Sequence, residues 1–177
     1  MINRIKLLLL IGLIWGQEEY NINYILEQNG LYVKKLSDEI VNGNVYQVSN
    51  DIKVFLGKMK NGKKVGLWTE WYSKQRKLEE HYKNGILDGS VSLFYKTGQR
   101  EWRHTYNNGQ PEGLWTYWYE DGRKMKEGNF DCGDSTGIWF WWDKNGYIKK
   151  EKRFKKRNKS IWANFNEYVL IEVIKVP

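Results

Sequence analysis

The sequence predicts an all-β fold, an elongated single-layer antiparallel sheet of consecutive β-hairpins. A heptapeptide recurs along the chain. GLWTEWY at residues 66–72 is nearly repeated as GLWTYWY at residues 113–119, and weaker copies begin at Gly89 and Gly137. The four initial glycines stand 23, 24 and 24 residues apart. A fixed period of this length indicates an internal repeat, with one supersecondary unit in each period.

Each period is typical of one hairpin. The residues after each initial glycine are mainly apolar and aromatic, in a run with the length and composition of a β-strand. A turn signal follows at Thr97-Gly98, Asp121-Gly122 and Asn145-Gly146, because tight turns need the positive φ that glycine adopts. A second, polar run then ends in an aromatic residue, at Tyr82, Tyr106, Phe130 and Phe154. A further turn leads into the next unit, so we expect the hairpins to join in series.

The pattern NGxxxGxWxxYxxDGxxxxEGxY resembles the MORN repeat variant of YwqK-like antitoxin proteins, over roughly residues 57–154. Residues 30–45 resemble the degenerate leading unit of the same family. The chain departs from the pattern at Gln75, where a turn glycine is expected, and at Asp143, which ends the last repeated strand. The resemblance implies a ribbon of hairpins that acts by binding, without catalytic residues and with an antitoxin or immunity role.

The N-terminus differs from the repeats. Arg4 and Lys6 precede an apolar run at residues 7–14, and a polar stretch begins at Gln17 after the small residue Gly16. This order is typical of a signal peptide, and the run is too short to anchor a protein across a bilayer. A buried N-terminal segment is the alternative. We expect export to the periplasm, the cell surface or the medium, with Gln17 as the first residue of the mature chain.

These features divide the chain into four segments. Residues 1–16 are the signal peptide, 17–56 a degenerate N-terminal repeat or cap, 57–159 four hairpin repeats, and 160–177 a capping strand. The last assignment depends on residues 168–176, which are mostly apolar and rich in β-branched side chains. A terminal repeat needs such a cap because it has no neighbour to bury its face.

The sequence offers little catalytic or metal-binding chemistry. Cys132 is the only cysteine, so no internal disulfide can form, and it occupies a turn position that asparagine holds in other units. His81 and His104 each lie 15 residues after an initial glycine, which predicts equivalent positions in neighbouring hairpins. Two imidazoles without a third ligand make a poor zinc site. Since no nucleophile–base set or metalloprotease motif is present, we predict no enzyme, no metal site and no cofactor.

Basic residues are in excess, with a formal net charge of +8, and they concentrate at residues 149–159. Two interpretations are open. The run is either an electrostatic patch for an acidic protein, anionic lipid or nucleic acid, or the solvated face of the last repeat, where lysines deter edge-to-edge pairing. We favour the second interpretation, and an exported protein meets little nucleic acid.

The aromatic residues give the strongest indication of function. Alternate strand residues face opposite sides, so the rings two and five positions after the initial glycine lie on opposite faces. A single-layer sheet cannot bury both faces fully, even where strand twist and lysine stems cover part of them. We assign a structural role to Trp68, Trp115 and Trp139. The residues predicted to bind a partner are Trp71, Phe94, Trp118 and Trp142.

Two classes of function follow. The first is a protein-binding scaffold with a toxin as one candidate partner, which the family resemblance favours and which agrees with the prevalence of Trp and Tyr in interfaces. The alternative is a module that binds cell-wall polysaccharide. Aromatic hairpin repeats of that kind have a similar period, but this chain lacks their second Gly-Trp pair. Anionic lipid is a weaker candidate ligand, and nucleic acid is weaker still.

Overall fold

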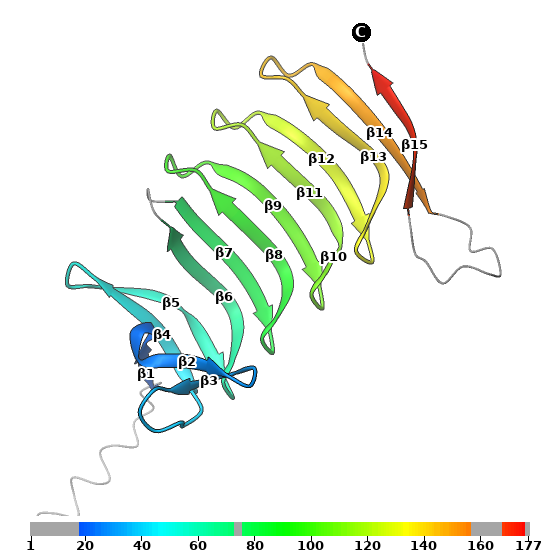
Figure 1. Cartoon of the computed structure of the whole chain (residues 1–177). Helices are drawn as coiled ribbons and strands as arrows, with labels where there is room; N and C mark the ends of the chain where they lie inside the picture. The colour runs from blue at the N-terminus through cyan, green and yellow to red at the C-terminus, as the bar shows by residue number, and fades with distance from the viewer. Residues whose placement is uncertain (1–17, 73–75, 157–167, 176–177) are drawn as a thin grey trace, which may run out of the picture. The chain divides into compact units, whose positions relative to one another are not determined.

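A computed structural model describes residues 18–72, 76–156 and 168–175, with the backbone alone for Lys156 and the last range. The predicted signal peptide and Gln75 lie outside these ranges. The chain divides into two compact units, Met1–Lys63 and Lys64–Pro177. Regular structure in the described residues is β-strand apart from a single 3-10 turn (Figure 1), so the all-β prediction is confirmed.

The first unit contains three paired strands, a separate two-stranded hairpin and an apolar core. Its elements are β1 (Glu19–Asn21), η2 (Ile22–Tyr24), β2 (Ile25–Gln28), β3 (Leu31–Lys34), β4 (Gly43–Ser49) and β5 (Ile52–Lys60). β4 and β5 form an antiparallel hairpin, β1 pairs in parallel with β4, and β2 pairs with β3. Val41, Val45 and Met59 are almost fully buried. The parallel strand and the separate β2–β3 hairpin distinguish this unit from a simple leading hairpin.

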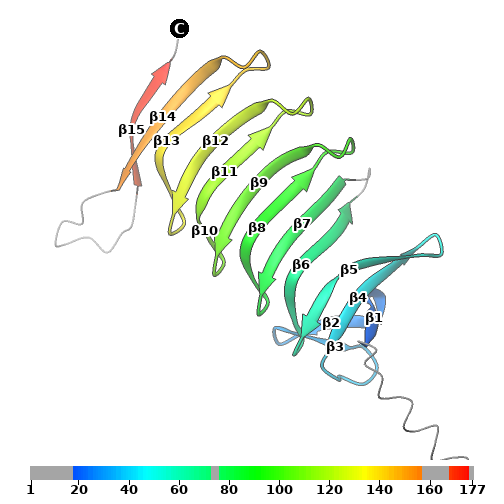
Figure 2. The ribbon, with the colours of Figure 1, turned by 180° about the vertical axis from the view of Figure 1, so that it is seen from behind.

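The second unit is one antiparallel sheet of consecutive hairpins. Its strands are β6 (Lys63–Tyr72), β7 (Arg76–Lys83), β8 (Ile86–Phe94), β9 (Arg100–Asn107), β10 (Gln110–Pro111), β11 (Gly113–Trp118), β12 (Lys124–Asp131), β13 (Asp134–Trp142), β14 (Ile148–Lys156) and β15 (Tyr168–Lys175). Strands follow one another in chain order, with β10 paired to β9 beside the main path. Views from front and back (Figure 2) show no other described element of this unit over either face.

The last strand of this unit lies in the segment predicted to form a cap. β15 runs antiparallel to β14 along its length, from the pair Lys156–Tyr168 to the pair Lys150–Lys175. Residues 160–167, which belong to the same predicted segment, lie outside the described residues. β15 therefore supplies backbone partners to a strand that would otherwise present a free edge.

Two kinds of turn alternate along the sheet. Turns between successive hairpins place two residues in the left-handed region, as at Asn84 (φ 53°) and Gly85 (φ 83°). Cys132 adopts φ 50° at the same place, which agrees with its prediction as a turn residue. The turns inside the hairpins that the structure describes use one glycine, such as Gly98 at φ 86°, whose N–H donates to the Tyr95 carbonyl at 2.9 Å. Asparagine tolerates this conformation, and glycine adopts it without steric penalty.

The initial glycine of each repeat lies opposite an aromatic side chain on the next strand of its own hairpin. The register pairs are Gly66–Tyr82, Gly89–Tyr106, Gly113–Phe130 and Gly137–Phe154. A glycine leaves a gap in a strand, and a cross-strand aromatic ring can cover it. In each hairpin, the aromatic residue near the end of the second strand is therefore the cross-strand partner of the glycine that begins the heptapeptide in the first strand.

Tyrosine side chains link successive hairpins. The Tyr95 hydroxyl donates to the Trp118 carbonyl at 2.8 Å, and the Tyr119 hydroxyl donates to the Trp142 carbonyl at 2.8 Å. The fourth repeat has Asp143 at the equivalent position. Its carboxylate accepts the backbone N–H groups of the following turn, at 2.8 and 3.0 Å. Asp143 thus closes its own turn.

Replacing Tyr119 with phenylalanine is expected to lower the free energy of unfolding by about 1 kcal/mol, because the Trp142 carbonyl loses its donor. Urea denaturation measures this change. Tyr147→Phe serves as the control, since Tyr147 is 73% exposed at a turn. A Tyr119→Phe variant as stable as the wild type would show that this hydrogen bond does not hold neighbouring hairpins together.

Candidate functional site

The second unit has two chemically different faces. Cross-strand partners lie on the same side of a sheet, and alternate residues along a strand lie on opposite sides. Face A carries the row Trp68, Glu80, Val91, His104, Trp115, Gly128, Trp139 and Lys152. Face B carries the row Thr69, Glu79, Ser92, Arg103, Thr116, Glu127, Phe140 and Glu151.

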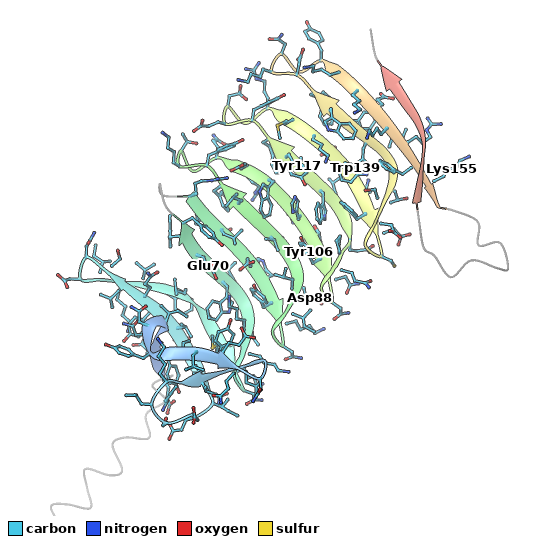
Figure 3. The ribbon with its side chains drawn as sticks, in the orientation of Figure 1. Glu70, Asp88, Tyr106, Tyr117, Trp139 and Lys155 are labelled. Atoms are coloured by element: carbon cyan, nitrogen blue, oxygen red, sulfur yellow. The ribbon has the colours of Figure 1, made fainter. Side chains whose placement is uncertain are left out.

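Aromatic rings cover the middle of face A (Figure 3). The His104 imidazole lies between two indoles, with ring centroids 4.1 Å from Trp102 and 3.7 Å from Trp115, at nearly parallel angles. The series continues from Trp115 to Phe130, at 4.3 Å, and from Phe130 to Trp139, at 5.2 Å. Because these rings pack on one another across four strands, face A holds the hydrophobic core of a one-layer sheet.

The structural tryptophans predicted from the sequence all lie on face A. Trp68 is 1% exposed and Trp139 is 3% exposed, whereas Trp115 is half-buried. The indole N–H of Trp115 donates to the Thr105 carbonyl at 3.1 Å, and that of Trp139 donates to the Asn129 carbonyl at 3.2 Å. Each of these two rings thus spans from its own strand to the backbone of a neighbouring strand.

Trp139 lies directly over Gly128 of the neighbouring strand. A Cβ atom added to Gly128 would approach Trp139 Cδ2 to 2.0 Å, far inside van der Waals contact. The absence of a side chain at this position therefore creates the space that the indole occupies. Sequence reasoning gave Gly128 no packing role, because it is neither an initial glycine of a repeat nor a turn glycine.

His104 is buried without a hydrogen-bond partner for Nε2. Burial, together with the nearby charge of Lys126, lowers the pKa of His104 from its ordinary value of 6.5 to about 4. The imidazole is therefore neutral at physiological pH and acts as a third flat ring in the stack.

The four rings predicted to bind a partner lie on face B and alternate with basic side chains. The Arg100 guanidinium carbon lies 5.6 Å from the Phe94 ring centre and 5.7 Å from that of Trp118. Lys77 Nζ lies 4.3 Å from the Phe94 ring centre, and Lys124 Nζ lies 5.7 Å from that of Trp142. We define the cation–aromatic strip as Trp71, Lys77, Phe94, Arg100, Trp118, Lys124 and Trp142.

Register explains why the strip is regular. In each hairpin the ring is the cross-strand partner of a residue six positions later, which gives the pairs Trp71–Lys77, Phe94–Arg100, Trp118–Lys124 and Trp142–Ile148. Trp71 is 54% exposed, and the other three rings are half-buried. Sequence reasoning found the rings and missed the cations. A basic residue six positions after three of the four rings was the available signal.

The two histidines are not equivalent, and the prediction that they occupy the same position is wrong. His81 pairs with Leu67 on face B, and its Nδ1 lies 2.8 Å from the Ser90 carbonyl oxygen. His104 pairs with Val91 on face A. The paired glycine and aromatic residue are 16 positions apart in the first hairpin (Gly66–Tyr82) and 17 in the second (Gly89–Tyr106), so the second strand of the first hairpin is displaced by one residue. In a strand, a displacement of one residue moves a side chain to the other face.

Two other features bring together side chains that could contact a ligand. Ligand atoms of Glu112, Asp131 and Cys132 lie within 4.8 Å of one another, but the Glu112 carboxylate accepts the Cys132 N–H at 2.9 Å and so supports the turn. A groove of about 380 Å³ on face A is lined by Tyr72, Arg76, Leu78, Leu93 and Trp102. Its lining is mainly apolar and contains no carboxylate, so it resembles a binding surface more than a reaction centre.

The described residues define a class, an all-β protein of consecutive hairpin repeats. They contain no helix of the length and hydrophobicity needed to cross a bilayer. No family model matches the chain, and no curated protein is significantly similar to it. The resemblance to the MORN repeat variant therefore stays a hypothesis that depends on the repeat pattern.

Proposed function

We propose that this protein is an exported, non-catalytic repeat scaffold that binds a protein partner through the cation–aromatic strip of face B. The observation that carries the proposal is the recurrence of one exposed or half-buried ring and one basic residue in successive hairpins. Trp and Arg are the residues most enriched at interface hot spots. Successive rings are two strands apart, about 10 Å, which suits an extended contact along a partner.

Apolar side chains beside the strip support a protein partner. Leu67 and Leu114 lie on the same face and are 46% and 48% exposed. An interface combines an apolar centre with a polar rim, and face B offers both kinds of side chain. A toxin bound by an antitoxin or immunity protein is the partner type that the family resemblance suggests.

Polysaccharide binding is less well supported by the ring geometry. A sugar stacks on an open aromatic face, but Lys77 and Arg100 both lie over Phe94, and cations also lie near Trp118 and Trp142. On face A the rings stack on one another, which occupies their faces in the same way. A polysaccharide would therefore have to displace existing cation–π or ring contacts.

The test screens the purified products of the reading frames beside the gene, toxin-like products first, and follows binding by calorimetry. Trp118→Ala and Trp142→Ala are each expected to weaken binding by about 30-fold, as hot-spot truncations do. Tyr147→Ala, which removes an exposed ring outside the strip, should change the affinity less than twofold. Thermal melts identify any variant that fails to fold.

Two results would overturn the proposal. One is wild-type affinity in both strip variants. The other is retention of the wild-type protein on purified peptidoglycan that is lost in Trp118→Ala and Trp142→Ala, which would establish the polysaccharide alternative.

A further inference from the structure

Three lysine side chains surround one tryptophan at the C-terminal end of face A. The Nζ atoms of Lys126 and Lys150 each lie 5.4 Å from the Trp141 ring centre, and that of Lys152 lies 5.9 Å from it. Register places Lys126 and Lys150 directly opposite Trp141 on β12 and β14. Lys152 is the partner of Trp139, two residues along the same strand as Trp141. Three positive charges are thus held around one indole.

No carboxylate neutralises this cluster in the described side chains. Lys64 and Lys124 each form an ion pair, with Glu70 and Glu127, whereas none of the ion pairs found in those side chains includes Lys126, Lys150 or Lys152. Alternation along the strands gives the reason. The acidic residues of β12 and β14 next to these lysines, Glu127 and Glu151, are on face B.

The central lysine is partly withdrawn from water. Lys126 Nζ lies 4.6 Å from the Trp139 ring centre and 5.1 Å from that of Tyr117. Burial and the positive charge of Lys152 lower the pKa of Lys126. The aromatic rings offset part of this cost through cation–π attraction, but they do not cancel the repulsion between the ammonium groups.

We propose that Lys126, Lys150 and Lys152 form a binding site for a phosphate group. A phosphate offers up to two negative charges and several acceptor oxygens, which three ammonium groups can share. A carboxylate brings one charge and two oxygens, so it matches the cluster less well. The half-buried rings of Tyr117 and Trp141 are positioned to contact the apolar part of a phosphate-bearing molecule.

This site is separate from the proposed protein-binding strip, because it lies on the opposite face of the sheet. The phosphate can belong to a soluble compound or to the headgroup of an anionic lipid. Both sources share the same chemistry toward the lysines, so the experiment uses one probe for each.

The first probe is pyrophosphate, titrated into the full chain at low salt and followed by calorimetry. Each of Lys126→Gln, Lys150→Gln and Lys152→Gln is expected to weaken binding about tenfold, the usual size of a lost charge-assisted hydrogen bond. The triple variant should show no measurable binding. Lys64→Gln is the matched control, because Lys64 also lies over aromatic rings of face A but has Glu70 as its partner.

The second probe is a set of vesicles, of phosphatidylglycerol or of phosphatidylcholine, in a sedimentation assay. If only the anionic vesicles are bound, and binding depends on the lysines, the site belongs to a lipid surface. If only pyrophosphate is bound, and binding depends on the lysines, the site belongs to a soluble phosphate compound. Thermal melts confirm that each variant is folded. The proposal is overturned if the wild type binds neither probe, if the triple variant binds like the wild type, or if Lys64→Gln loses binding equally.

Discussion

Replacing Trp139 with alanine is expected to lower the free energy of unfolding by about 3–5 kcal/mol, the usual cost of removing a buried aromatic side chain. The ring is 3% exposed, contacts Phe130 and Trp141, and donates a hydrogen bond to the Asn129 carbonyl. The same replacement at Trp142, on the same strand and the opposite face, should cost about 1–2 kcal/mol because that ring is only half-buried. Chemical denaturation measures both values.

A double-mutant cycle between Gly128 and Trp139 tests whether these two residues are in contact. Gly128→Ala should destabilise the wild type by at least about 2 kcal/mol, because the new Cβ overlaps the Trp139 ring and the core must shift. In the Trp139→Ala background, the same change should cost much less, since the ring is gone. Additive effects of the two substitutions would contradict the proposed contact, because only residues that interact show a coupling energy.

Replacing His104 with phenylalanine is expected to remove a pH-dependent loss of stability. The pKa of His104 is about 4 in the folded chain, below its ordinary value of 6.5, so the unfolded chain binds the proton first as the pH falls. The stabilising effect is complete above pH 6.5 and is lost progressively toward pH 4. A pKa shift of this size corresponds to a loss of about 3 kcal/mol in the free energy of unfolding at the acid end of the range.

The measurement is the free energy of unfolding of both proteins between pH 4 and pH 8. Carboxylates also titrate at the acid end of this range, but they are common to both proteins, so the difference between the two curves isolates His104. His104→Phe should be at least as stable as the wild type at pH 7, because it removes an unpartnered buried nitrogen. His81→Gln is the control and should lose as much free energy of unfolding between pH 8 and pH 4 as the wild type. Parallel curves for His104→Phe and wild type would refute the burial argument.

The hairpin architecture could be predicted from the sequence because its signals are local. The glycine series marked the turns, as at Gly98 and Gly122, and the aromatic runs between them have strand length. Turn conformation depends on a few adjacent residues, and strand alternation depends on a two-residue period. For the same reason, Trp139 and Trp142 could be placed on opposite faces without a structure.

The pairing and register of the strands could not be predicted from these local signals. A one-residue difference in register between the first two hairpins separates His81 from His104, and β1 joins β4 in parallel although neither belongs to a repeated motif. Counting residues from a glycine cannot detect such shifts, because a register depends on which side chains pack across the sheet. The contact of Trp139 with Gly128 also depends on register, because the two residues come from neighbouring strands.

The sequence by itself thus determined the number of repeats, the turns and the division of the aromatic residues between two faces. The tertiary structure alone decided the partners of each ring. It brings Arg100 between Phe94 and Trp118, and it gathers three lysines around Trp141. The physical reason is that a strand fixes the direction of its own side chains, whereas their neighbours come from other strands and depend on register and packing over the whole sheet.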